Sequence, residues 1–284
     1  MLPSELQSWI LNPDRLPLVM GVLNVTPDSF SDGGQFLDPE AAIAHGRQMV
    51  ADGADLIDVG AESTRPGATA ISADEQIRRI VPVIQKIATL PAIVSIDTTR
   101  AAVAAAALAA GATMVNDVSA GRDDAEMFPV VARRKVPIVL MHMLGTPQTM
   151  QDHPQYADVL SEVVQFLRER TVAAQSAGVT LDQILLDPGI GFGKTVEHNL
   201  TLLRRQDALV ALGRPLVIGT SRKGFIGKIT NEPDPAKRLF GTAATVAWSI
   251  LHGASIVRVH DVRAMVQVVR MIQAIGREDF LTKQ

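Results

Sequence analysis

Eight alternations of a short apolar run with a longer helical pattern constrain the fold of this 284-residue chain more than any other feature. The apolar runs are rich in β-branched residues and predict strands at 18–23, 55–59, 92–96, 113–115, 137–141, 183–186, 215–218 and 255–259. The segments between them predict helices at 39–52, 77–87, 99–110, 123–134, 159–167, 196–212, 235–251 and 262–272. Strands that alternate with helices in this way run parallel, so the sequence predicts an α/β fold.

Glycine residues mark the ends of several predicted helices, just before the next strand begins. They are Gly53, Gly111, Gly178 and Gly253. Glycine is favoured there because the residue that ends a helix commonly adopts a left-handed conformation. Eight such units in about 260 residues favour a closed (β/α)₈ barrel, the TIM barrel, over an open sheet. We therefore predict a single domain over 1–284, with 1–17 as an N-terminal lead.

The composition is that of a globular protein and excludes several kinds of chemistry. With 27 Lys and Arg against 30 Asp and Glu, the net charge of −3 gives no general attraction to nucleic acid or to an anionic membrane. The lack of cysteine excludes disulfides, thiolate nucleophiles and cysteine-ligated metals. Because the sequence shows neither a signal peptide nor a run of about 20 apolar residues, we expect a cytoplasmic protein.

Polar residues stand at or just beyond the C-terminal end of every predicted strand, where barrel enzymes carry their active sites. In chain order they are Asn24, Asp58, Asp97, Asn116 with Asp117, His142, Asp187, the segment 220–223, and Arg258 with His260. Arg258 and His260 share one face of the last strand, and a guanidinium in a barrel mouth is costly unless an anion meets it. Long connections follow the first, second and fifth strands, at 26–38, 61–72 and 143–155, and are predicted to be mobile loops over this site.

Structural roles compete with functional ones at several of these positions. A lone Asp or Asn after a strand is more often a helix cap or an Asx-turn residue. We therefore interpret Asp58 and Asp117 as structural. His142 and His153, each taken alone, fit hydrogen-bonded loop or core histidines.

The glycine-rich stretch 187–195 resembles a phosphate-binding loop but lacks its spacing. Pro188 stands where the first glycine of that motif would be required. The glycines of this stretch are instead predicted to let the backbone approach a flat ligand beside Asp187.

Eight motifs resemble, in the same order, those of the dihydropteroate synthase family. The most specific are NVTPDSFSDGG at 24–34 and ESTRPG at 62–67, and the others lie at 95–98, 116–117, 140–142, 186–189, 221–223 and 258–261. The resemblance implies a (β/α)₈ barrel, usually a homodimer, that acts in folate biosynthesis. Such an enzyme joins 7,8-dihydropterin-6-ylmethyl diphosphate to 4-aminobenzoate and releases diphosphate and 7,8-dihydropteroate.

The resemblance also implies roles for individual residues. Asn24 would be the Mg²⁺ ligand, and the diphosphate would be held by Arg258, His260 and Arg65. The substrate-binding residues would be Asp97, Asn116, Met141, Asp187 and Lys223 for the pterin, Thr64, Pro66 and Phe192 for 4-aminobenzoate, and Gly219. The catalytic residues would be Asp28, Arg65, Asp97, Lys223, Arg258 and His260, with Asp28 on a loop that closes over the reacting groups.

Two details concern sulfonamides, which compete with 4-aminobenzoate in this family. The loop 64–67 has no insertion of the kind carried by resistant relatives, so we expect ordinary sulfonamide sensitivity. Gly224 stands where relatives often carry Ser or a larger residue near the 4-aminobenzoate carboxylate. A side-chain hydroxyl is missing there, which leaves the backbone N–H at the start of the next helix to hold that anion.

Three other functions are compatible with parts of this pattern. A methyltetrahydrofolate methyltransferase that serves a corrinoid protein would share the pterin contacts of Asp97, Asn116 and Asp187 but would not need the diphosphate-binding residues. A Schiff-base aldolase would use Lys223 as its nucleophile. A catalytically inactive pterin-binding protein is the third alternative, and the presence of every implied role disfavours it. Release of diphosphate on adding the pterin substrate separates the synthase from the methyltransferase, and borohydride trapping with a carbonyl substrate would reveal the aldolase.

Overall fold

The computed structural model describes residues 3–26, 39–62, 71–145, 150 and 153–276. Eight parallel strands form one sheet in the order β6-β5-β4-β3-β2-β1-β8-β7. A parallel bridge between Leu186 and Leu216 joins the two ends of this sheet and closes the barrel. The strands are β1 (Leu18–Asn24), β2 (Leu56–Gly60), β3 (Ile93–Asp97), β4 (Met114–Asp117), β5 (Ile138–Met141), β6 (Ile184–Asp187), β7 (Val217–Ile218) and β8 (Ile256–Val259).

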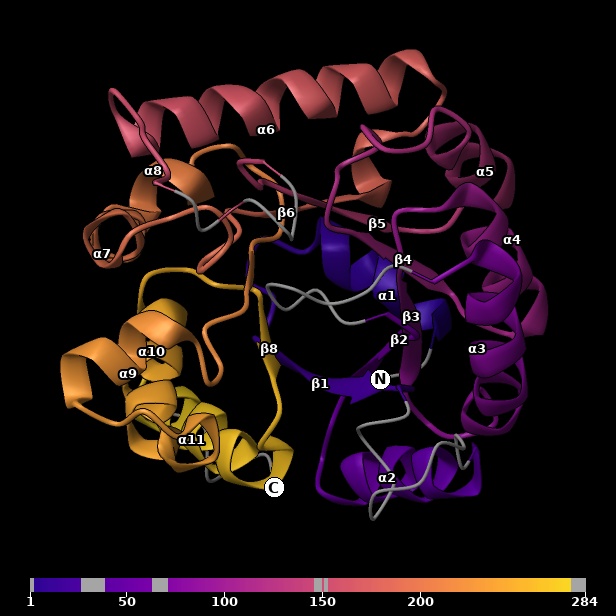
Figure 1. The fold of residues 1–284 in the computed structure, drawn as a ribbon, viewed down its shortest axis with the longest axis horizontal. Helices are drawn as coiled ribbons and strands as arrows, with labels where there is room; N and C mark the ends of the chain where they lie inside the picture. Colours follow the sequence, from indigo (N-terminus) through magenta and orange to yellow (C-terminus); the bar gives the residue numbers. More distant parts are fainter. Residues whose placement is uncertain (1–2, 27–38, 63–70, 146–149, 151–152, 277–284) are drawn as a thin grey trace.

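Most of the helices surround the strands on the outside of the barrel (Figure 1). They are α1 (Pro3–Leu11), α2 (Pro39–Ala51), α3 (Ala73–Ile87), α4 (Ala101–Ala110), α5 (Met127–Arg134), α6 (Val159–Ser176), α7 (Val196–Arg204), α8 (Gln206–Val210), α9 (Gly224–Thr230), α10 (Leu239–Leu251) and α11 (Val262–Ile275), with 3₁₀ turns η2 (Leu181–Gln183) and η3 (Pro235–Lys237). Each predicted strand is present close to its predicted bounds. The predicted (β/α)₈ barrel is confirmed.

The helices depart from their predicted bounds where local chemistry interrupts the pattern. The segment 196–212 forms two helices, α7 and α8, because the chain leaves helical geometry at Arg205. α10 begins at Leu239, and the residues before it form a separate 3₁₀ turn that Asp234 caps by accepting a hydrogen bond from the Ala236 N–H. The predicted lead 1–17 contains a helix, α1, that the sequence analysis does not anticipate.

The predicted glycine helix ends are confirmed. Gly53, Gly111, Gly178 and Gly253 have positive φ angles of 99°, 117°, 94° and 91°. At Gly111 space also excludes a side chain, because a Cβ atom would lie 2.8 Å from the Cβ of Ala88. Each of these glycines turns the chain from the outer helical layer back toward the barrel.

α1 closes the N-terminal end of the barrel. Its Leu6, Trp9 and Ile10 belong to a buried cluster that includes side chains from all eight strands. The strand members lie in the first half of each strand and are Leu18, Met20, Leu56, Ile93, Met114, Val139, Leu185, Val217 and Ile256. Arg15 secures the end of α1, since its guanidinium donates to the carbonyls of Trp9 and Ile10. Apolar packing fills this end of the barrel and leaves the C-terminal end to polar side chains.

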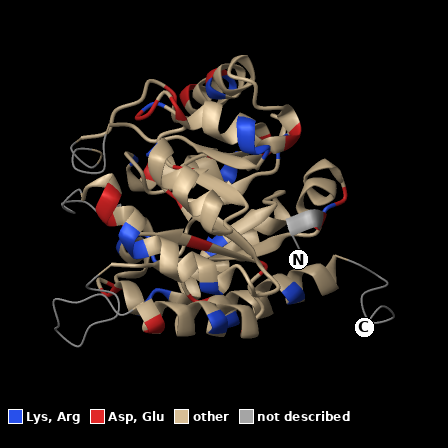
Figure 2. Ribbon diagram, turned by 90° about the vertical axis from the view of Figure 1, so that its right-hand side faces the viewer, with Lys and Arg blue, Asp and Glu red and all other residues tan. Residues whose placement is uncertain are grey.

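A second and larger core lies between the strands and the surrounding helices and includes Leu23, Ile57 and Ile96. Charged residues of both signs are interspersed over the fold, as Figure 2 shows. Within the described ranges, no helix is long and apolar enough to cross a membrane.

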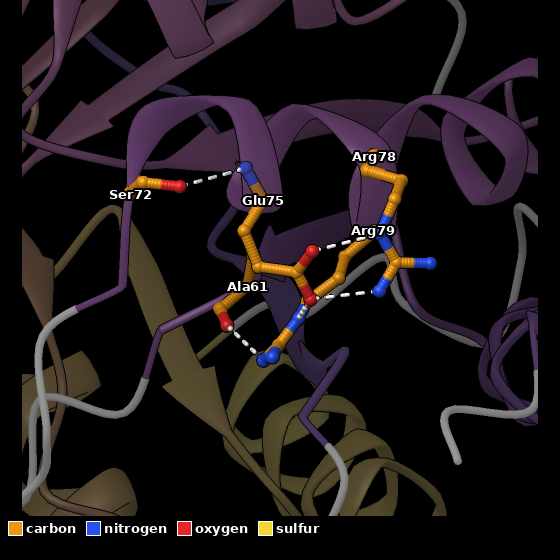
Figure 3. A network of polar contacts seen from close by, with 5 residues as sticks. All are labelled: Ala61, Ser72, Glu75, Arg78 and Arg79. Atoms are coloured by element: carbon orange, nitrogen blue, oxygen red, sulfur yellow. Dashed lines mark hydrogen bonds and ion pairs between the residues drawn. The ribbon is translucent and has the colours of Figure 1, made fainter.

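A polar network fixes the start of α3 beside the end of β2, on either side of 63–70 (Figure 3). Ser72 caps α3 by accepting a hydrogen bond from the Glu75 N–H at 3.2 Å. The Glu75 carboxylate accepts from Nε of Arg79 at 2.6 Å. Arg79 also donates to the carbonyl of Ala61, which follows β2 directly. The network therefore holds both ends of this strand-to-helix connection at the rim of the barrel.

Candidate active site

A cavity of about 610 Å³ opens at the C-terminal ends of the strands, and a smaller hollow adjoins it. The two share Asp97, Phe192, Gly219, Lys223 and Arg258 in their walls. Every predicted site residue in the described part of the chain lines one or both of them. The others are Asn24 and His260 in the cavity and Asn116, Met141 and Asp187 in the hollow.

The remaining predicted site residues lie outside the described residues. Asp28 belongs to the segment 27–38, and Thr64, Arg65 and Pro66 belong to the segment 63–70. Their roles stay predictions, as does the prediction that these segments are mobile loops.

Arg258 lies between two carboxylates at the mouth of the barrel. Its Nε donates to Oδ2 of Asp58 and its Nη2 donates to Oδ2 of Asp97, each at 2.7 Å. Asp58 is fully buried within β2, so its interpretation as a helix cap or Asx-turn residue is wrong. The anions that meet this partly buried guanidinium are the protein's own carboxylates, and a substrate phosphate would join an ion pair that already exists.

Asp58 connects this ion pair to a further predicted pterin contact. It accepts a hydrogen bond from Nδ2 of Asn116 at 2.9 Å, in addition to the bond from Arg258. Its other oxygen, Oδ1, is buried and has no hydrogen-bond partner among the residues that the structure describes. Three successive strands, β2, β3 and β4, thus contribute Asp58, Asp97 and Asn116 to one polar group around the guanidinium of β8.

The pKa of Asp97 reflects the opposing charges in this group. Burial raises the pKa of Asp97 to about 7, and Arg258 opposes that rise. The nearby charges of Asp58 and Asp117 raise the same pKa, and Lys223 lowers it. Burial thus favours the neutral carboxyl of Asp97 and Arg258 favours the ionised one, so the charge of Asp97 responds to whatever binds beside it.

Asp187 and Lys223 face the smaller hollow from the end of β6 and from the residue before α9. Burial raises the pKa of Asp187 to about 6. The Gly189 N–H donates to Oδ1 of Asp187 at 2.7 Å, and this hydrogen bond opposes the rise. Burial and the charge of Arg258 lower the pKa of Lys223 to about 8. The Lys223 ammonium lies 3.7 Å from the ring centroid of Phe192, in a cation–π contact. This wall offers a flat polar ligand an acceptor, a donor and an aromatic surface.

His260 joins the cavity just after β8. Its Nδ1 lies 3.0 Å from Oγ of Ser221, and its backbone N–H donates to the same oxygen at 3.1 Å. Burial lowers the pKa of His260 to about 4, and Arg258 and Arg222 lower it further. The imidazole is therefore neutral at pH 7 before an anion binds.

The glycines after β6 pack against the protein's own chain. A Cβ atom on Gly189 would lie 1.8 Å from the carbonyl oxygen of His142, and one on Gly193 would lie 2.6 Å from that of Leu144. On Gly191, a Cβ atom would meet the Lys223 side chain at 2.8 Å. All three have positive φ. The close approaches seen here are to β5, its following residues and Lys223, and the approach of these glycines to a flat ligand stays a prediction.

Two structural interpretations are confirmed. Asp117 forms an Asx turn, accepting from the N–H groups of Ser119 and Gly121 at 2.8 and 2.7 Å. His142 is buried and hydrogen-bonded through Nδ1. The donor to His142 is Lys194, a buried lysine in the cavity wall that the sequence analysis missed. The sequence signal for Lys194 was the pair Gly193-Lys194 near the end of the stretch 187–195, which resembles a phosphate-binding loop.

The donor set for a metal is sparse in the described residues. No group of three or more His, Asp or Glu side chains that could hold a metal occurs among them. Asn24 ends β1 and lines the cavity, where its amide oxygen is a hard ligand. One protein oxygen fits Mg²⁺, which commonly takes most of its ligands from substrate phosphates and water.

The family model described as pterin binding enzyme matches residues 20–260. The chain belongs to this family, and within it to the dihydropteroate synthases, which are transferases of folate biosynthesis.

The relatives that support this assignment cover nearly the whole chain. The dihydropteroate synthase of Synechocystis sp. is 51% identical over 260 residues, which is 91% of this chain and 90% of the relative. A structure of the Xanthomonas albilineans enzyme with 4-aminobenzoic acid has a TM-score of 0.87 at 46% identity and covers 92% of this chain and 93% of its own. A Yersinia pestis enzyme in a sulfonamide drug complex has a TM-score of 0.86 at 39% identity, with 92% and 94% covered.

Proposed function

We propose that the cavity condenses 7,8-dihydropterin-6-ylmethyl diphosphate with 4-aminobenzoate through the residues that line it. The observation that carries this proposal is the convergence of Asp187, Lys223 and Arg258 on one connected space at the barrel mouth. The hollow itself measures only about 20 Å³, so the pterin lies where it opens into the larger cavity, against Asn116, Met141 and Asp187, with the diphosphate toward β8.

Pterin recognition depends on a buried acceptor. The pterin ring presents a guanidine-like donor edge, and the Asp187 carboxylate accepts two hydrogen bonds from it. Asn116 and Lys223 bind the opposite polar edge, and Met141 packs against the ring. Met141 belongs to a small apolar cluster with Phe192. A buried carboxylate such as Asp187 discriminates strongly against a ligand that lacks these donors.

The diphosphate is bound by Arg258 and His260, with Arg65 from the segment 63–70. A guanidinium fork matches a phosphate group geometrically. Because Arg258 already contacts Asp58 and Asp97, these carboxylates hold its side chain in position before the substrate arrives. Bound Mg²⁺, with Asn24 as its protein ligand, would supply further positive charge to the leaving diphosphate.

The reaction begins with cleavage of the bond between the pterin methylene carbon and the diphosphate oxygen. Both electrons of that bond leave with the diphosphate, whose growing charge Arg258, His260 and Arg65 stabilise. The electron-rich pterin and the ionised form of Asp97 stabilise the carbocation. The neutral amine of 4-aminobenzoate then attacks the methylene carbon, and its extra proton passes to solvent.

The second substrate occupies the cavity beside Phe192 and the alkyl stem of Lys223, with Thr64 and Pro66 completing the pocket. The Xanthomonas relative was solved with 4-aminobenzoic acid and the Yersinia relative with a sulfonamide. These relatives support 4-aminobenzoate as the substrate here and sulfonamides as its competitors. Asp28, which lies outside the described residues, is the remaining catalytic residue of this proposal.

A coupled assay of diphosphate release tests the proposed function. We expect release to require the pterin diphosphate, 4-aminobenzoate and Mg²⁺, and to fall when a sulfonamide is added. A protein that releases no diphosphate with both substrates and Mg²⁺ present would contradict the proposal. Release without 4-aminobenzoate at the full rate would indicate a hydrolase.

A homodimer in the cytoplasm completes the proposal. Large apolar side chains are exposed on the adjacent helices α10 and α11, among them Phe240 at 86% and Ile275 at 68%. Such surfaces favour association between proteins. Light scattering is expected to give twice the protomer mass for the wild-type protein and the protomer mass for Phe240→Glu. A monomeric wild-type protein would contradict the dimer.

We also propose that the chain folds as a single domain. Two transitions in calorimetric unfolding would contradict this.

A further inference from the structure

Lys194 is a charged side chain buried in the wall of the active site. Only 3% of its surface is exposed. Its Nζ lies 2.9 Å from Nδ1 of His142 and 3.0 Å from the carbonyl oxygens of Gly189 and Phe192. Within the described residues it forms no ion pair with a carboxylate. An ammonium without a salt bridge needs another reason to be buried here.

The hydrogen bonds account for every proton of the ammonium. A lysine ammonium has three N–H donors, and these three partners can each accept one. The carbonyl of His142, at 3.5 Å, is a weaker fourth contact. Nδ1 of His142 is therefore an acceptor, and the imidazole is neutral with its proton on Nε2. Burial and the charge of Lys194 lower the pKa of His142 to about 3, in agreement with this state.

The partners of Lys194 belong to the two chain segments that form the pterin wall. Gly189 and Phe192 lie in the connection after β6, and His142 follows β5. Gly189 also donates to Asp187, and the ring of Phe192 lies against the ammonium of Lys223. A single side chain thus connects the backbone around the proposed pterin acceptor with the backbone that places the proposed 4-aminobenzoate contact.

Further bonds hold the same connection from outside. The Gly191 N–H donates to Oδ1 of Asn199 at 2.7 Å, and the Tyr156 hydroxyl donates to the carbonyl of Gly193 at 2.7 Å. These bonds fix the outer part of the connection. Lys194 is the side chain that binds its inner carbonyls, next to the substrates.

We infer that Lys194 is a positioning residue for both substrate pockets, holding Phe192 and Gly189 in place and keeping a positive charge behind Asp187. This inference rests on the proposed roles of Asp187 and Phe192 in binding the pterin and 4-aminobenzoate. Lys194 touches neither reacting atom and acts through these two neighbours.

The charge of Lys194 has its own consequence. Asp187 faces three cations, Lys223, Arg258 and Lys194, each of which lowers its pKa against the effect of burial. Burial and Lys223 lower the pKa of Lys194 to about 7 while Asp187 raises it, so Lys194 carries its full charge below neutral pH, where the acid limb lies; it also faces the neutral His142, and Arg122 lies near His142. Removal of the Lys194 charge raises the pKa of Asp187 further. Because only the carboxylate can accept from the pterin edge, the loss of pterin affinity on acidification then begins at higher pH.

Three variants separate position from charge. Lys194→Met removes both, and we expect the KM for 4-aminobenzoate to rise about tenfold. The acid limb of the affinity for 7,8-dihydropterin-6-ylmethyl diphosphate, measured by calorimetry, moves to higher pH. His142→Phe keeps the charge but removes one acceptor, so the KM rises while the acid limb stays. Lys86→Met, at an exposed lysine of α3, is the control and leaves both quantities unchanged.

His142→Phe is expected to fold, since an aromatic ring at this position keeps the edge contact with Phe166, whose centroid lies 4.8 Å away. A folded Lys194→Met protein with wild-type KM and acid limb would overturn the inference. If Lys194→Met does not fold, an unchanged KM for 4-aminobenzoate in His142→Phe would overturn it. A wild-type protein that releases no diphosphate would contradict the proposed function instead, so the two failures are distinguishable.

Discussion

Two walls of the active site are stabilised in different ways. On the wall formed by β6 and the connection after it, buried polar groups have matched partners, as Asp187 with Gly189 and Lys194 with its three acceptors show. On the wall formed by β2, β3 and β8, one guanidinium is shared by two carboxylates. One oxygen of Asp58 there has no hydrogen-bond partner within the described structure.

The difference separates two tasks of a transferase. A wall whose donors and acceptors are already paired is rigid, and rigidity suits recognition of a flat ring. The other wall has two negative charges and one positive charge. This imbalance changes when the carbocation forms and the negatively charged diphosphate leaves. The raised pKa of Asp97 expresses this imbalance, and its ionised form favours a cation at the reacting carbon. We assign recognition to the first wall and charge stabilisation to the second.

The largest expected effect comes from Arg258→Ala, which removes the only cation that contacts both carboxylates in the described structure. Leaving Asp58 buried without its partner should reduce the free energy of unfolding by about 3–5 kcal/mol. The loss of a cation at the leaving diphosphate should reduce kcat/KM by about 100-fold or more. Urea unfolding and the diphosphate assay measure the two effects. Turnover within a few-fold of wild type would remove Arg258 from the diphosphate site, and Arg78→Ala on the surface of α3 serves as the control.

Gly189→Ala tests whether the recognition wall is as rigid as its contacts indicate. The new Cβ atom would lie 1.8 Å from the carbonyl oxygen of His142, in a residue whose φ is +66°. Backbone strain and this clash together should cost about 3 kcal/mol or more of stability. Gly213→Ala is the matched control, since its φ is +73° and no atom lies within 4 Å of the new Cβ atom. Equal melting temperatures of the two variants would show that the backbone of this wall can shift to accommodate the new Cβ atom.

The fold was largely predictable because its signals are local and repeated. Hydrophobic periodicity places each strand close to its observed bounds, and glycine marks the turns back to the barrel. α1 was not predictable in the same way. Its role as a plug depends on Leu6, Trp9 and Ile10 meeting residues from all eight strands, and that contact is created only when the barrel closes.

The candidate site was predictable where a residue ends a strand and not where its partner is distant in sequence. Asn24, Asp97 and Asp187 follow from strand position and motif. Asp58 looked like a cap because the sequence does not show that Arg258, 200 residues away, faces it across the barrel. Lys194 was missed for the same reason, since its acceptors come from two separate connections.

Asp58→Asn tests the charge imbalance of the wall formed by β2, β3 and β8, because it removes a negative charge and keeps an acceptor of similar shape. The negative charge of Asp58 raises the pKa of Asp97, so its removal lowers that pKa. The acid limb of the kcat profile should therefore move to lower pH, and stability should fall by about 1–3 kcal/mol as the bonds to Arg258 and Asn116 weaken. A pH–rate profile and urea unfolding measure both. An acid limb that stays in place would show that Asp97 does not control the profile.

The smallest expected effect is in the pH dependence of stability, compared between wild type and Asp97→Asn. The folded-state pKa of Asp97, about 7, lies above its ordinary value of 3.8. A raised pKa means that the contribution of Asp97 to stability is fully present below about pH 4 and is lost as the pH rises through about 7. Urea unfolding of both proteins across this range should show wild type losing stability relative to the variant as the pH increases. The opposite slope would mean that Arg258 outweighs burial and holds Asp97 ionised, which would make this wall as well matched as the one beside β6.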